Sequence, residues 1–381
     1  MSGQLALLAT DFPPGPGGIQ TLTWEVYRRL ADLTAVVIAP AGDASAASYD
    51  SELPVKRLPR GAGAGWRALP YLYAAASCVR GLRPAPAVVH CNHLFAGYAG
   101  WWLRRRTGLP YLVWVHGEEM TKGRYRRLMR ASLSGAAALL VNSDYTAAVV
   151  RNFLGSATPP LCKIPLGASN GWLAAPPTPP PAGAEPVLLS VARLCARDRY
   201  KGIDTCLRTL ARLRERGLRC RYRIVGDGDD RAYLEGISRE LGIAAQVEFL
   251  GRVTPDALMA QYDACDIFLL CSREQTAERG VGFEGFGIVL LEAAARARPA
   301  VAGRSGGIPD AVADGVSGLL VDPQSPGAVA DAVARLWSDP GLRQRLGAQA
   351  RARVAAGFTW DHAAAAVRRI HRQLSGTEAR S

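Results

Sequence analysis

Two glutamates flank a glycine-containing run in the second half of the chain. The run is Glu284-Gly-Phe-Gly-Ile-Val-Leu-Leu-Glu292, and its apolar part predicts a helix that starts after Gly287. The first amides of a helix lack intrahelical acceptors and, with the helix dipole, attract an anion. One carboxylate could then accept ribose hydroxyls and the other sugar hydroxyls, with a diphosphate between them. In the alternative interpretation, Glu284 only enters the helix and Glu292 is a solvated helix residue.

Two cations precede this run, in Ser190-Val-Ala-Arg193 and Tyr200-Lys201-Gly202. Arg193 follows a predicted strand and Lys201 precedes a predicted helix, so both fall at the loop edge of a sheet. Paired cations at such an edge can hold a diphosphate and stabilise it as it leaves. Only four of the 46 basic residues are lysines, and a compact ammonium suits a crowded phosphate better than a planar guanidinium. The alternative is a solvated loop charge.

Asp227-Gly-Asp229 spells a pair of carboxylates that other enzymes use to hold Mn²⁺ on a diphosphate. Here the pair follows a predicted strand in a glycine-rich turn, and Arg193 and Lys201 already supply positive charge. We therefore expect no metal site and no cofactor. Pro14-Gly-Pro-Gly-Gly18 is also rich in glycine, but it does not fit the GxGxxG dinucleotide pattern.

Short apolar runs alternate with helical patterns along the whole chain, which predicts parallel sheets covered by helices on both faces. Five prolines between residues 176 and 181 mark a stiff linker. We therefore expect two Rossmann-like α/β domains facing each other across a cleft, with ligands beyond the carboxyl ends of the strands. The predicted parts are a domain at 1–174, a linker at 175–186, a domain at 187–356, and a final helical segment at 357–381. The sequence leaves open whether that last segment packs back on the first domain.

The composition fits a soluble globular protein, with 49% hydrophobic and 21% charged residues among 381. The eight cysteines form no CxxC pair and no zinc spacing, so we expect reduced thiols and a cytoplasmic location. The N-terminal apolar stretch is too short for a signal peptide, and no run reaches the 18 or so apolar residues that span a bilayer.

The net charge of +13 is concentrated in the first half of the chain. Trp101-Trp102 precedes Arg104-Arg105-Arg106, and a second basic cluster contains Lys122, Arg124, Arg126, Arg127 and Arg130. A tryptophan pair beside cations suits an anionic lipid surface, so one hypothesis is a lipid-linked acceptor at the inner face of the cell membrane. The equal alternative is a solvated face in an arginine-rich protein. Nucleic acid is excluded as a partner, because no basic run alternates with base-stacking aromatics.

Short motifs follow one another along the chain. In chain order they are Asp11–Ile19, Val115–Glu118, Asn142-Ser143 with Ile164–Gly167, Val225–Gly228, Phe249–Gly251, Glu284–Glu292 and Ser305–Pro309. Together and in this order, they resemble the motifs of the family 4 retaining glycosyltransferases, which have the GT-B fold. The resemblance covers nearly the whole chain, and each of its motifs is weak when taken singly. One departure is Leu166, where the family more often has asparagine, and another is the long polar connection at 272–283.

The resemblance implies roles for individual residues. His116 would lie against the transferred sugar, although a lone histidine is more often a core or surface residue. Arg193 and Lys201 would bind the diphosphate, Glu284 the sugar, and Glu292 the ribose. The other donor-binding residues implied are Gly17, Gly18, Gly226, Gly251, Val253, Phe286, Gly287, Ile288 and Val289. No metal ion and no carboxylate nucleophile are implied.

The sequence thus predicts an enzyme that moves a sugar from a nucleotide-diphosphate sugar to a hydroxyl, in glycolipid, envelope polysaccharide or glycosylated metabolite synthesis. The first domain would bind the acceptor and the second the donor. One alternative is a sugar-nucleotide epimerase of the same architecture, and another is a nucleotide-sugar-binding protein without catalysis. The donor base, the sugar, the acceptor and the oligomeric state are not predicted.

Overall fold

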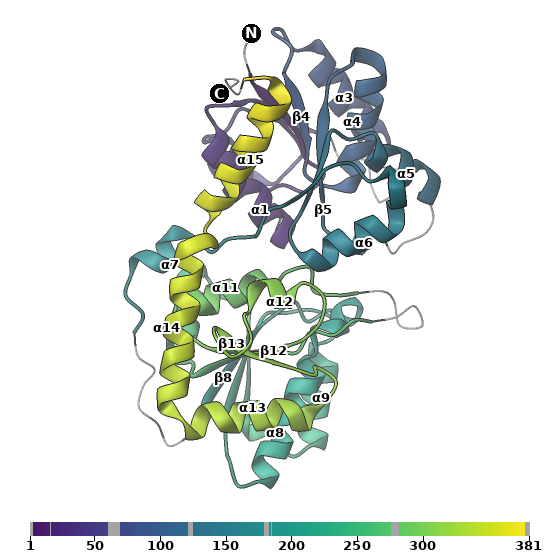
Figure 1. The fold of residues 1–381 in the computed structure, drawn as a ribbon. Helices are drawn as coiled ribbons and strands as arrows, with labels where there is room; N and C mark the ends of the chain where they lie inside the picture. Colours follow the sequence, from purple (N-terminus) through teal and green to yellow (C-terminus); the bar gives the residue numbers. More distant parts are fainter. Residues whose placement is uncertain are drawn as a thin grey trace. The chain divides into compact units, whose positions relative to one another are not determined.

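A computed structural model describes residues 3–15, 17–59, 69–120, 125–178, 183, 185–275 and 282–377. The chain forms two compact units (Figure 1). Unit 1 combines Met1–Leu166 with Trp360–Ser381, and unit 2 is Gly167–Thr359. The division after Leu166 therefore falls earlier than the boundary after residue 174 that the proline-rich stretch predicts.

Unit 1 is built on a seven-stranded parallel sheet with the order β3-β2-β1-β4-β5-β6-β7. The residues of β1, β4, β5 and β6 are all buried, as the continuous apolar runs predict. The strands are β1 (Leu5–Leu8), β2 (Thr34–Pro40), β3 (Val55–Leu58), β4 (Val88–Cys91), β5 (Tyr111–Val115), β6 (Ala138–Val141) and β7 (Leu161–Lys163).

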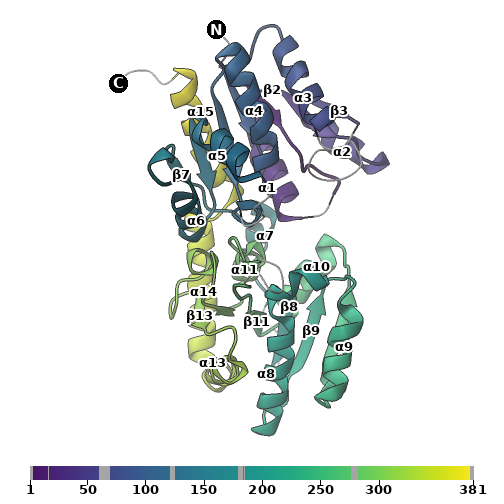
Figure 2. The same ribbon diagram turned by 90° about the vertical axis from the view of Figure 1, so that its right-hand side faces the viewer.

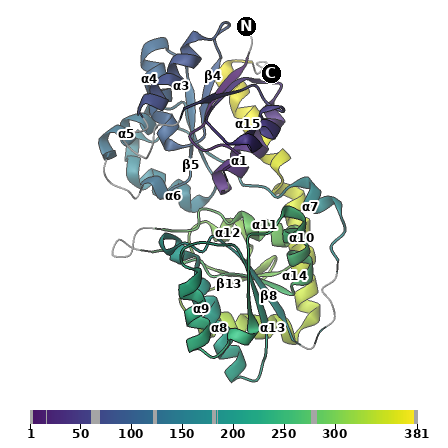
Figure 3. The same ribbon diagram turned by 180° about the vertical axis from the view of Figure 1, so that it is seen from behind.

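Helices cover both faces of this sheet. Helices α3, α4 and α5 lie side by side on one face, and α1 and α15 lie together on the other (Figures 1 and 3). The helices of unit 1 are α1 (Gly18–Tyr27), α2 (Ala47–Asp50), α3 (Leu69–Gly81), α4 (Leu94–Thr107), α5 (Arg126–Ser134), α6 (Asp144–Leu154) and α15 (Trp360–Ser375).

Unit 2 repeats the design with a six-stranded parallel sheet in the order β10-β9-β8-β11-β12-β13. The central strands β8 and β11 pair with Leu188 opposite Ile267, and the core lies between the sheet and helices such as α8 and α13, which pack together. The strands are β8 (Val187–Val191), β9 (Arg221–Val225), β10 (Val247–Gly251), β11 (Ile267–Leu270), β12 (Ala300–Gly303) and β13 (Gly318–Val321).

The helices of unit 2 surround its sheet, as Figure 2 shows for α8, α9 and α10. They are α7 (Asn170–Ala174), α8 (Ile203–Glu215), α9 (Arg231–Glu240), α10 (Pro255–Ala264), α11 (Ile288–Ala295), α12 (Ile308–Ala311), α13 (Pro326–Ser338) and α14 (Pro340–Gly357). Two parallel α/β domains are therefore present, and the predicted fold class is confirmed.

Two buried arginines explain why the segment after Leu166 belongs to unit 2. Arg296 donates to the carbonyls of Trp172, Ala175 and Pro176, each at 3.0 Å, and pairs with the Asp263 carboxylate at 2.8 Å. Arg298 donates to the Thr178 carbonyl. These bonds attach the start of the predicted linker to unit 2. Sequence composition marks the prolines of this linker but not the arginines that hold it.

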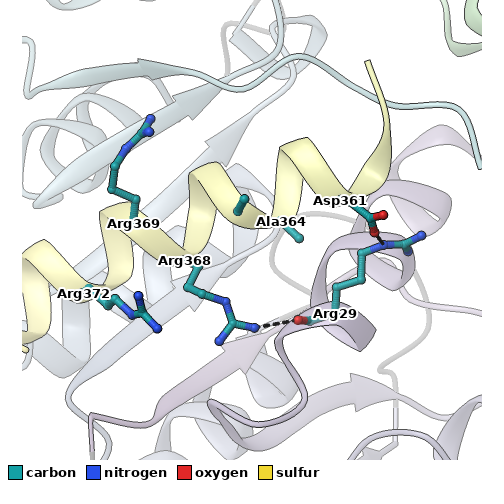
Figure 4. A pocket seen from close by; sticks show the side chains of 7 residues that line it. Arg29, Asp361, Ala364, Arg368, Arg369 and Arg372 are labelled. Carbon is teal, nitrogen blue, oxygen red and sulfur yellow. Dashed lines mark hydrogen bonds and ion pairs between the residues drawn. The ribbon is translucent and has the colours of Figure 1, made fainter. Parts of the chain in front are cut away.

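The C-terminal helix α15 packs on α1 in unit 1. Its exposed edge is held by the ion pair of Arg29 with Asp361 (Figure 4) and by that of Arg368 with Asp32 at 2.6 Å. Arg368 also donates to the Arg29 carbonyl at 2.8 Å. Such exposed pairs contribute little each, so the stability of this contact depends mainly on its buried side.

A buried chain of hydrogen bonds joins α15 to the sheet. His371 Nε2 bonds to the Gly3 carbonyl. His90 Nε2 lies 3.1 Å from His371 Nδ1, and Tyr27 Oη lies 3.0 Å from His90 Nδ1. A carbonyl only accepts, so His371 carries its proton on Nε2 and accepts at Nδ1. His90 Nε2 therefore donates to His371 Nδ1, and Tyr27 Oη donates to His90 Nδ1. An additional proton on either ring would lack an acceptor, and burial lowers the pKa of both histidines.

We expect the free energy of unfolding to fall as the pH drops below about 6.5. The unfolded chain takes up protons on His90 and His371 near their ordinary pKa of 6.5, while burial lowers the pKa of both rings in the folded protein. The unfolded state therefore binds more protons than the folded state below this pH, and stability is lost as the pH falls. Urea unfolding at pH 7.5 and 5.5 measures this loss. His371→Gln should reduce it, and His362→Gln, exposed on the same helix, should not; an equal loss in both variants would contradict the assignment.

Candidate functional site

The order of the sheet in unit 2 reverses direction between β8 and β11, whose carboxyl ends therefore open a crevice. Arg193 follows β8, and Ser272 follows β11. The chain then brings Lys201 and Glu284 to the same edge. The structure places three predicted site residues together here, Arg193, Lys201 and Glu284, although they are widely separated in sequence.

Lys201 and Glu284 form a direct ion pair. Lys201 Nζ lies 2.5 Å from Glu284 Oε2, and the two side chains are only 17% and 12% exposed. Ser272 Oγ donates to the same carboxylate oxygen at 3.4 Å. Burial opposes the charge on Lys201, but the carboxylate of Glu284 outweighs it and raises the pKa of Lys201. The ammonium therefore stays charged at neutral pH in a site of low solvent exposure.

Gly202 explains how Lys201 reaches this position. Its φ of 72° lies in the left-handed region, and a Cβ there would come within 2.0 Å of the Cys271 carbonyl oxygen. The backbone between Lys201 and α8 thus presses against the end of β11, which a side chain at 202 would prevent. This close approach brings Lys201 to Ser272 and Glu284.

The Ser305–Pro309 motif supports Glu284 from behind. Gly307 N donates to the Glu284 carbonyl at 2.8 Å, and Gly306, with φ 55°, lies so close that a Cβ would come within 2.4 Å of the same oxygen. The two glycines therefore fix the backbone of Glu284. The adjacent pair of glycines before a helix marks this motif in the sequence, but the pattern alone assigns no role to it.

Helix α11 begins where the sequence predicts it. Gly287 caps the helix with φ 90°, and its carbonyl accepts from Leu290 N at 2.9 Å. The amides of Ile288 and Val289 thus lie in the first turn, where a helix leaves amides for an outside acceptor. Phe286 is buried and packs against Phe358, with 6.2 Å between ring centroids. Phe286 is therefore a packing residue in this structure.

Glu292 lies one turn further along α11. Tyr262 Oη donates to Glu292 Oε2 at 2.8 Å. Burial raises the pKa of Glu292, and the bond from Tyr262 partly offsets that rise. The two glutamates of the predicted motif thus have different environments: Glu284 is paired with a cation, and Glu292 is hydrogen-bonded to a neutral hydroxyl.

Arg193 is the most accessible cation of the group. Its side chain is 55% exposed, and Nε lies 3.3 Å from Oδ2 of the buried Asp198. A hollow at this point is lined by Arg193, Lys201 and Asp204, among others. Arg193 therefore lines the same hollow as Lys201, with more than half of its side chain exposed.

The carboxylates of the Asp227-Gly-Asp229 motif are engaged locally. Asp229 Oδ1 accepts from Ala196 N at 2.9 Å, and Asp227 Oδ1 accepts from Gly228 N at 3.0 Å. A Cβ on Gly226 would lie 1.8 Å from the Ala192 carbonyl oxygen. The turn thus packs against the loop that carries Arg193. The part of the chain that the structure describes contains no group of acidic, histidine or cysteine side chains suited to a metal ion.

Gly251 is the last residue of β10, and Val253 follows this strand at the far side of the same edge. Gly226 N donates to the Gly251 carbonyl at 2.8 Å, which joins the ends of β9 and β10. Gly251 adopts φ 68°, and Val253 is half-buried. Of the predicted donor residues in unit 2, these two and Gly226 lie at strand ends, and the others lie at α11 or the Lys201 loop.

The polar connection at 272–283 is tied down at its base. Arg273 N donates to the Tyr200 carbonyl at 2.8 Å, and Gln275 N donates to the Gly282 carbonyl at 2.9 Å. Arg273 also pairs with Asp204 at 2.9 Å. Residues 276–281 of this connection lie outside the described residues.

A second polar cluster lies at the carboxyl ends of β1, β4 and β5 in unit 1. His116 Nε2 lies 3.0 Å from the Asn92 carbonyl, and its backbone N donates to Glu119 Oε1 at 2.9 Å. The ring stacks on His93 at 5.8 Å. Asn92 in turn donates to the Asp11 carbonyl at 2.6 Å. Asn92, His93 and Glu119 were not singled out from the sequence, because only the sheet order brings them to His116.

The carbonyl partner fixes the state of His116. Since Asn92 O can only accept, the His116 Nε2 carries the proton and Nδ1 keeps its lone pair. Burial lowers the pKa of His116, and Glu119 only partly offsets this. The predicted glycines lie at the start of α1: Gly17 is its N-cap with φ 153°, and Gly18 is its first residue. The Gly17 carbonyl accepts from Thr21 N at 3.0 Å.

A hollow of about 630 Å³ lies elsewhere in unit 1, beside α15 (Figure 4). It is lined by Arg29, Asp361, Ala364, Ala365, Arg368, Arg369 and Arg372. None of these is a predicted site residue. Figure 4 shows Arg369 pointing away from Arg368, so the arginines do not converge on one point.

Both halves of the chain match models of known families. Residues 176–353 match the family described as "Glycosyl transferases group 1", and residues 17–167 match the "Glycosyl transferase 4-like domain". In solved structures, sucrose-phosphate synthase from Thermosynechococcus elongatus superimposes with a TM-score of 0.81 and 23% identity, covering 98% of this chain and all of that one. Anabaena HepE in complex with UDP gives 0.78 and 20% identity, covering 98% of this chain and all of that one. These likenesses confirm the GT-B fold.

Curated relatives show the family. A GDP-mannose-dependent α-(1-6)-phosphatidylinositol monomannoside mannosyltransferase of Mycobacterium tuberculosis is 38% identical over 48% of this chain, and the match spans 46% of that protein. A D-inositol 3-phosphate glycosyltransferase of Corynebacterium diphtheriae is 31% identical over 73% of this chain and 68% of that protein. The predicted resemblance is confirmed: the chain belongs to the group 1 glycosyl transferases, in the family 4 lineage of GT-B enzymes.

Proposed function

We propose that the protein transfers a sugar from a nucleotide-diphosphate sugar to a hydroxyl of an acceptor. The observation that carries the proposal is the buried contact between Lys201 and Glu284 beside the start of α11. At one edge of the sheet, it combines the Lys201 ammonium, the Glu284 carboxylate, which would accept hydrogen bonds from sugar hydroxyls, and the first amides of α11. The names of two relatives, a GDP-mannose-dependent mannosyltransferase and a D-inositol 3-phosphate glycosyltransferase, agree with this chemistry.

The proposed reaction breaks the bond between the anomeric carbon and the donor phosphate oxygen. The leaving diphosphate takes the electron pair, the acceptor oxygen forms the new bond, and the acceptor proton passes to the departing phosphate. Lys201 and Arg193 stabilise the negative charge that grows on the diphosphate, and the first amides of α11 donate hydrogen bonds to its oxygens. Glu284 accepts sugar hydroxyls. Attack on the same face as departure gives retention of the anomeric configuration, as family membership suggests.

We also propose that Glu292 accepts the ribose hydroxyls and that Gly251 and Val253 lie near the base. Gly17 and Gly18 would allow close approach of the α1 start to the donor, and His116 would contact the transferred sugar. The neutral His116 ring suits a hydrogen-bonding role, because its unprotonated Nδ1 accepts a sugar hydroxyl. Phe286 supports the site through packing.

Two alternatives predict different products. An epimerase changes the sugar of the donor without any acceptor, and a pure binding protein turns over no acceptor at all. Incubation with the nucleotide sugar alone, followed by analysis of the sugar, separates an epimerase from a transferase. The ion pair favours transfer, because Glu284 is tied to a cation and is poorly placed to abstract a proton.

The donor base is the first property to determine. The relatives and solved neighbours include proteins named with GDP-mannose and with UDP, and neither name fixes the donor here. A ligand that binds the native state raises the melting temperature. A thermal-shift screen of UDP-, GDP- and ADP-sugars therefore identifies the donor and leaves the acceptor open.

An aromatic and basic patch on α3 and α4 supports a membrane-associated acceptor. Arg105 lies over the Trp101 ring at 5.0 Å and Arg106 over the Trp102 ring at 5.4 Å, and Tyr73 next to Trp102 is 63% exposed. No described helix is both long and apolar enough to cross a bilayer. We propose peripheral contact of this patch with anionic lipid at the inner face of the cell membrane, where a lipid-linked acceptor would lie. Lys122 and Arg124, from the predicted second cluster, lie outside the described residues.

We expect Lys201→Ala to lower kcat by about 10² to 10³, because a positive charge aimed at the leaving group is lost. Steady-state kinetics with the donor from the screen measures the effect, and thermal melting checks that the variant is folded. Lys163→Ala is the matched control, since Lys163 is 41% exposed and pairs with Asp144 in unit 1. Full activity of folded Lys201→Ala would contradict the diphosphate assignment.

We propose that turnover needs no metal ion, since Asp227 and Asp229 bond to backbone amides next to Arg193. Activity should therefore persist in EDTA, and Asp229→Asn should lower stability rather than change any metal dependence. The assay compares initial rates with EDTA and after addition of Mn²⁺ or Mg²⁺. A loss in EDTA that Mn²⁺ restores would make these aspartates ligands instead.

We expect the protein to co-sediment with vesicles of phosphatidylglycerol and phosphatidylcholine at low salt. Replacement of Arg104, Arg105 and Arg106 by Gln should weaken binding on the order of 100-fold, at about 1 kcal/mol for each cation. The matched control replaces three exposed arginines of unit 2, Arg212, Arg219 and Arg239. No binding at low or moderate salt, or equal weakening in both triple variants, would refute the membrane proposal.

A further inference from the structure

The Glu292 carboxylate is held by a single hydroxyl. Tyr262 Oη lies 2.8 Å from Glu292 Oε2 and 3.3 Å from the Val289 carbonyl. A hydroxyl has one proton, and the shorter contact to a charged acceptor receives it. Within the described ranges, no other hydrogen bond to this carboxylate is recorded. Its second oxygen therefore keeps its full capacity to accept a hydroxyl from a ligand.

Tyr262 cannot easily change its position. The residue is fully buried, and its ring contacts the rings of Trp172, at 5.3 Å and 74°, and of Phe268, at 5.5 Å and 37°. Phe268 belongs to the central strand β11, and Trp172 belongs to α7. The ring is thus held by contacts from the sheet and from α7.

Trp172 is itself held by α11. Arg296 lies one turn beyond Glu292, is 2% exposed, and donates to the Trp172 carbonyl at 3.0 Å. The contacts form a closed circuit, from Glu292 to Tyr262, to Trp172, to Arg296 and back along the helix. A carboxylate on a helix surface usually has several rotamers, and the hydrogen bond from Tyr262 favours the one seen here.

We propose that Tyr262 is a positioning residue of the donor site, which points the Glu292 carboxylate so that its free oxygen accepts a ribose hydroxyl, and that Trp172 holds the Tyr262 ring for this purpose. The proposal rests on the proposed function, in which Glu292 binds the ribose. It adds the residues that make the carboxylate selective. Tyr262 is outside the sequence motif, and only its hydrogen bond from α10 to α11 reveals it.

The Tyr262 bond also matters for the charge of Glu292. Burial raises the pKa of Glu292, and the hydrogen bond from Tyr262 lowers it. A protonated carboxyl would be a poorer acceptor than a carboxylate. The hydroxyl therefore supports both the direction and the ionised form of this side chain.

Calorimetry of nucleoside diphosphates tests the proposal without knowledge of the sugar or acceptor. The probes are UDP, GDP and ADP, each compared with its 2′-deoxy and 3′-deoxy form. For the diphosphate that binds, we expect the unmodified protein to prefer the ribose form over one deoxy form on the order of 10-fold, the value of one good hydrogen bond. Tyr262→Phe keeps the ring and its packing, and it should lose most of this preference.

A merely structural defect would weaken the ribose and deoxy forms alike and would leave the preference unchanged. The matched control is Tyr222→Phe, which removes another buried hydroxyl from unit 2, one that donates to Ser190 Oγ at 2.8 Å. This control should keep the preference. If Tyr262→Phe does not fold, Trp172→Leu frees the ring without removing the hydroxyl and should reduce the preference in part.

The two proposals fail in different ways. Glu292→Gln should also lose the preference; if it keeps the preference, or if none of the three diphosphates binds, the proposed ribose site itself is wrong. If Glu292→Gln loses the preference and a folded Tyr262→Phe or Trp172→Leu keeps it, Glu292 binds the ribose without Tyr262, and the positioning proposal is overturned.

Discussion

The buried ion pair between Lys201 and Glu284 is the interaction on which the candidate site depends. Removing two charges from water is costly unless they meet each other in good geometry, and here the distance is 2.5 Å. The surrounding chain is shaped to permit that meeting. Gly202 lets the Lys201 loop press against the end of β11, and Gly306 and Gly307 hold the backbone of Glu284. A ligand with a diphosphate supplies a second anion for the same ammonium.

Both units place polar side chains at the strand ends of their sheets, but the side chains differ in their chemistry. In each, the polar side chains gather where the strand order changes direction, because that is where the helices diverge and leave the strand ends open. Unit 2 places cations and a helix start at this edge, which suits a diphosphate. Unit 1 places Asn92, His93 and the neutral His116 there, which suits the hydroxyl groups of a neutral ligand.

The alternation of apolar runs was enough to predict two parallel α/β domains, because strands buried on both faces have few polar positions. The motif from Glu284 to Glu292 and the start of α11 after Gly287 could also be predicted from the sequence. Contacts between distant segments could not be predicted. Tyr262 and the arginines that attach the linker act through contacts between distant segments, and no local pattern marks them. The motif that contains Gly306 and Gly307 is visible in the sequence, but its contact with the backbone of Glu284 is not. The domain boundary was placed too late for the same reason, since Arg296 binds carbonyls that the sequence assigns to the first domain or the linker.

The most direct test of the central claim is a crystal structure of the protein with a bound nucleoside diphosphate. The account predicts phosphate oxygens within hydrogen-bond distance of Lys201 Nζ and of the Ile288 or Val289 amide, with the ribose next to Glu292. A diphosphate bound elsewhere, or bound at this edge with Lys201 still directed only at Glu284, would contradict it.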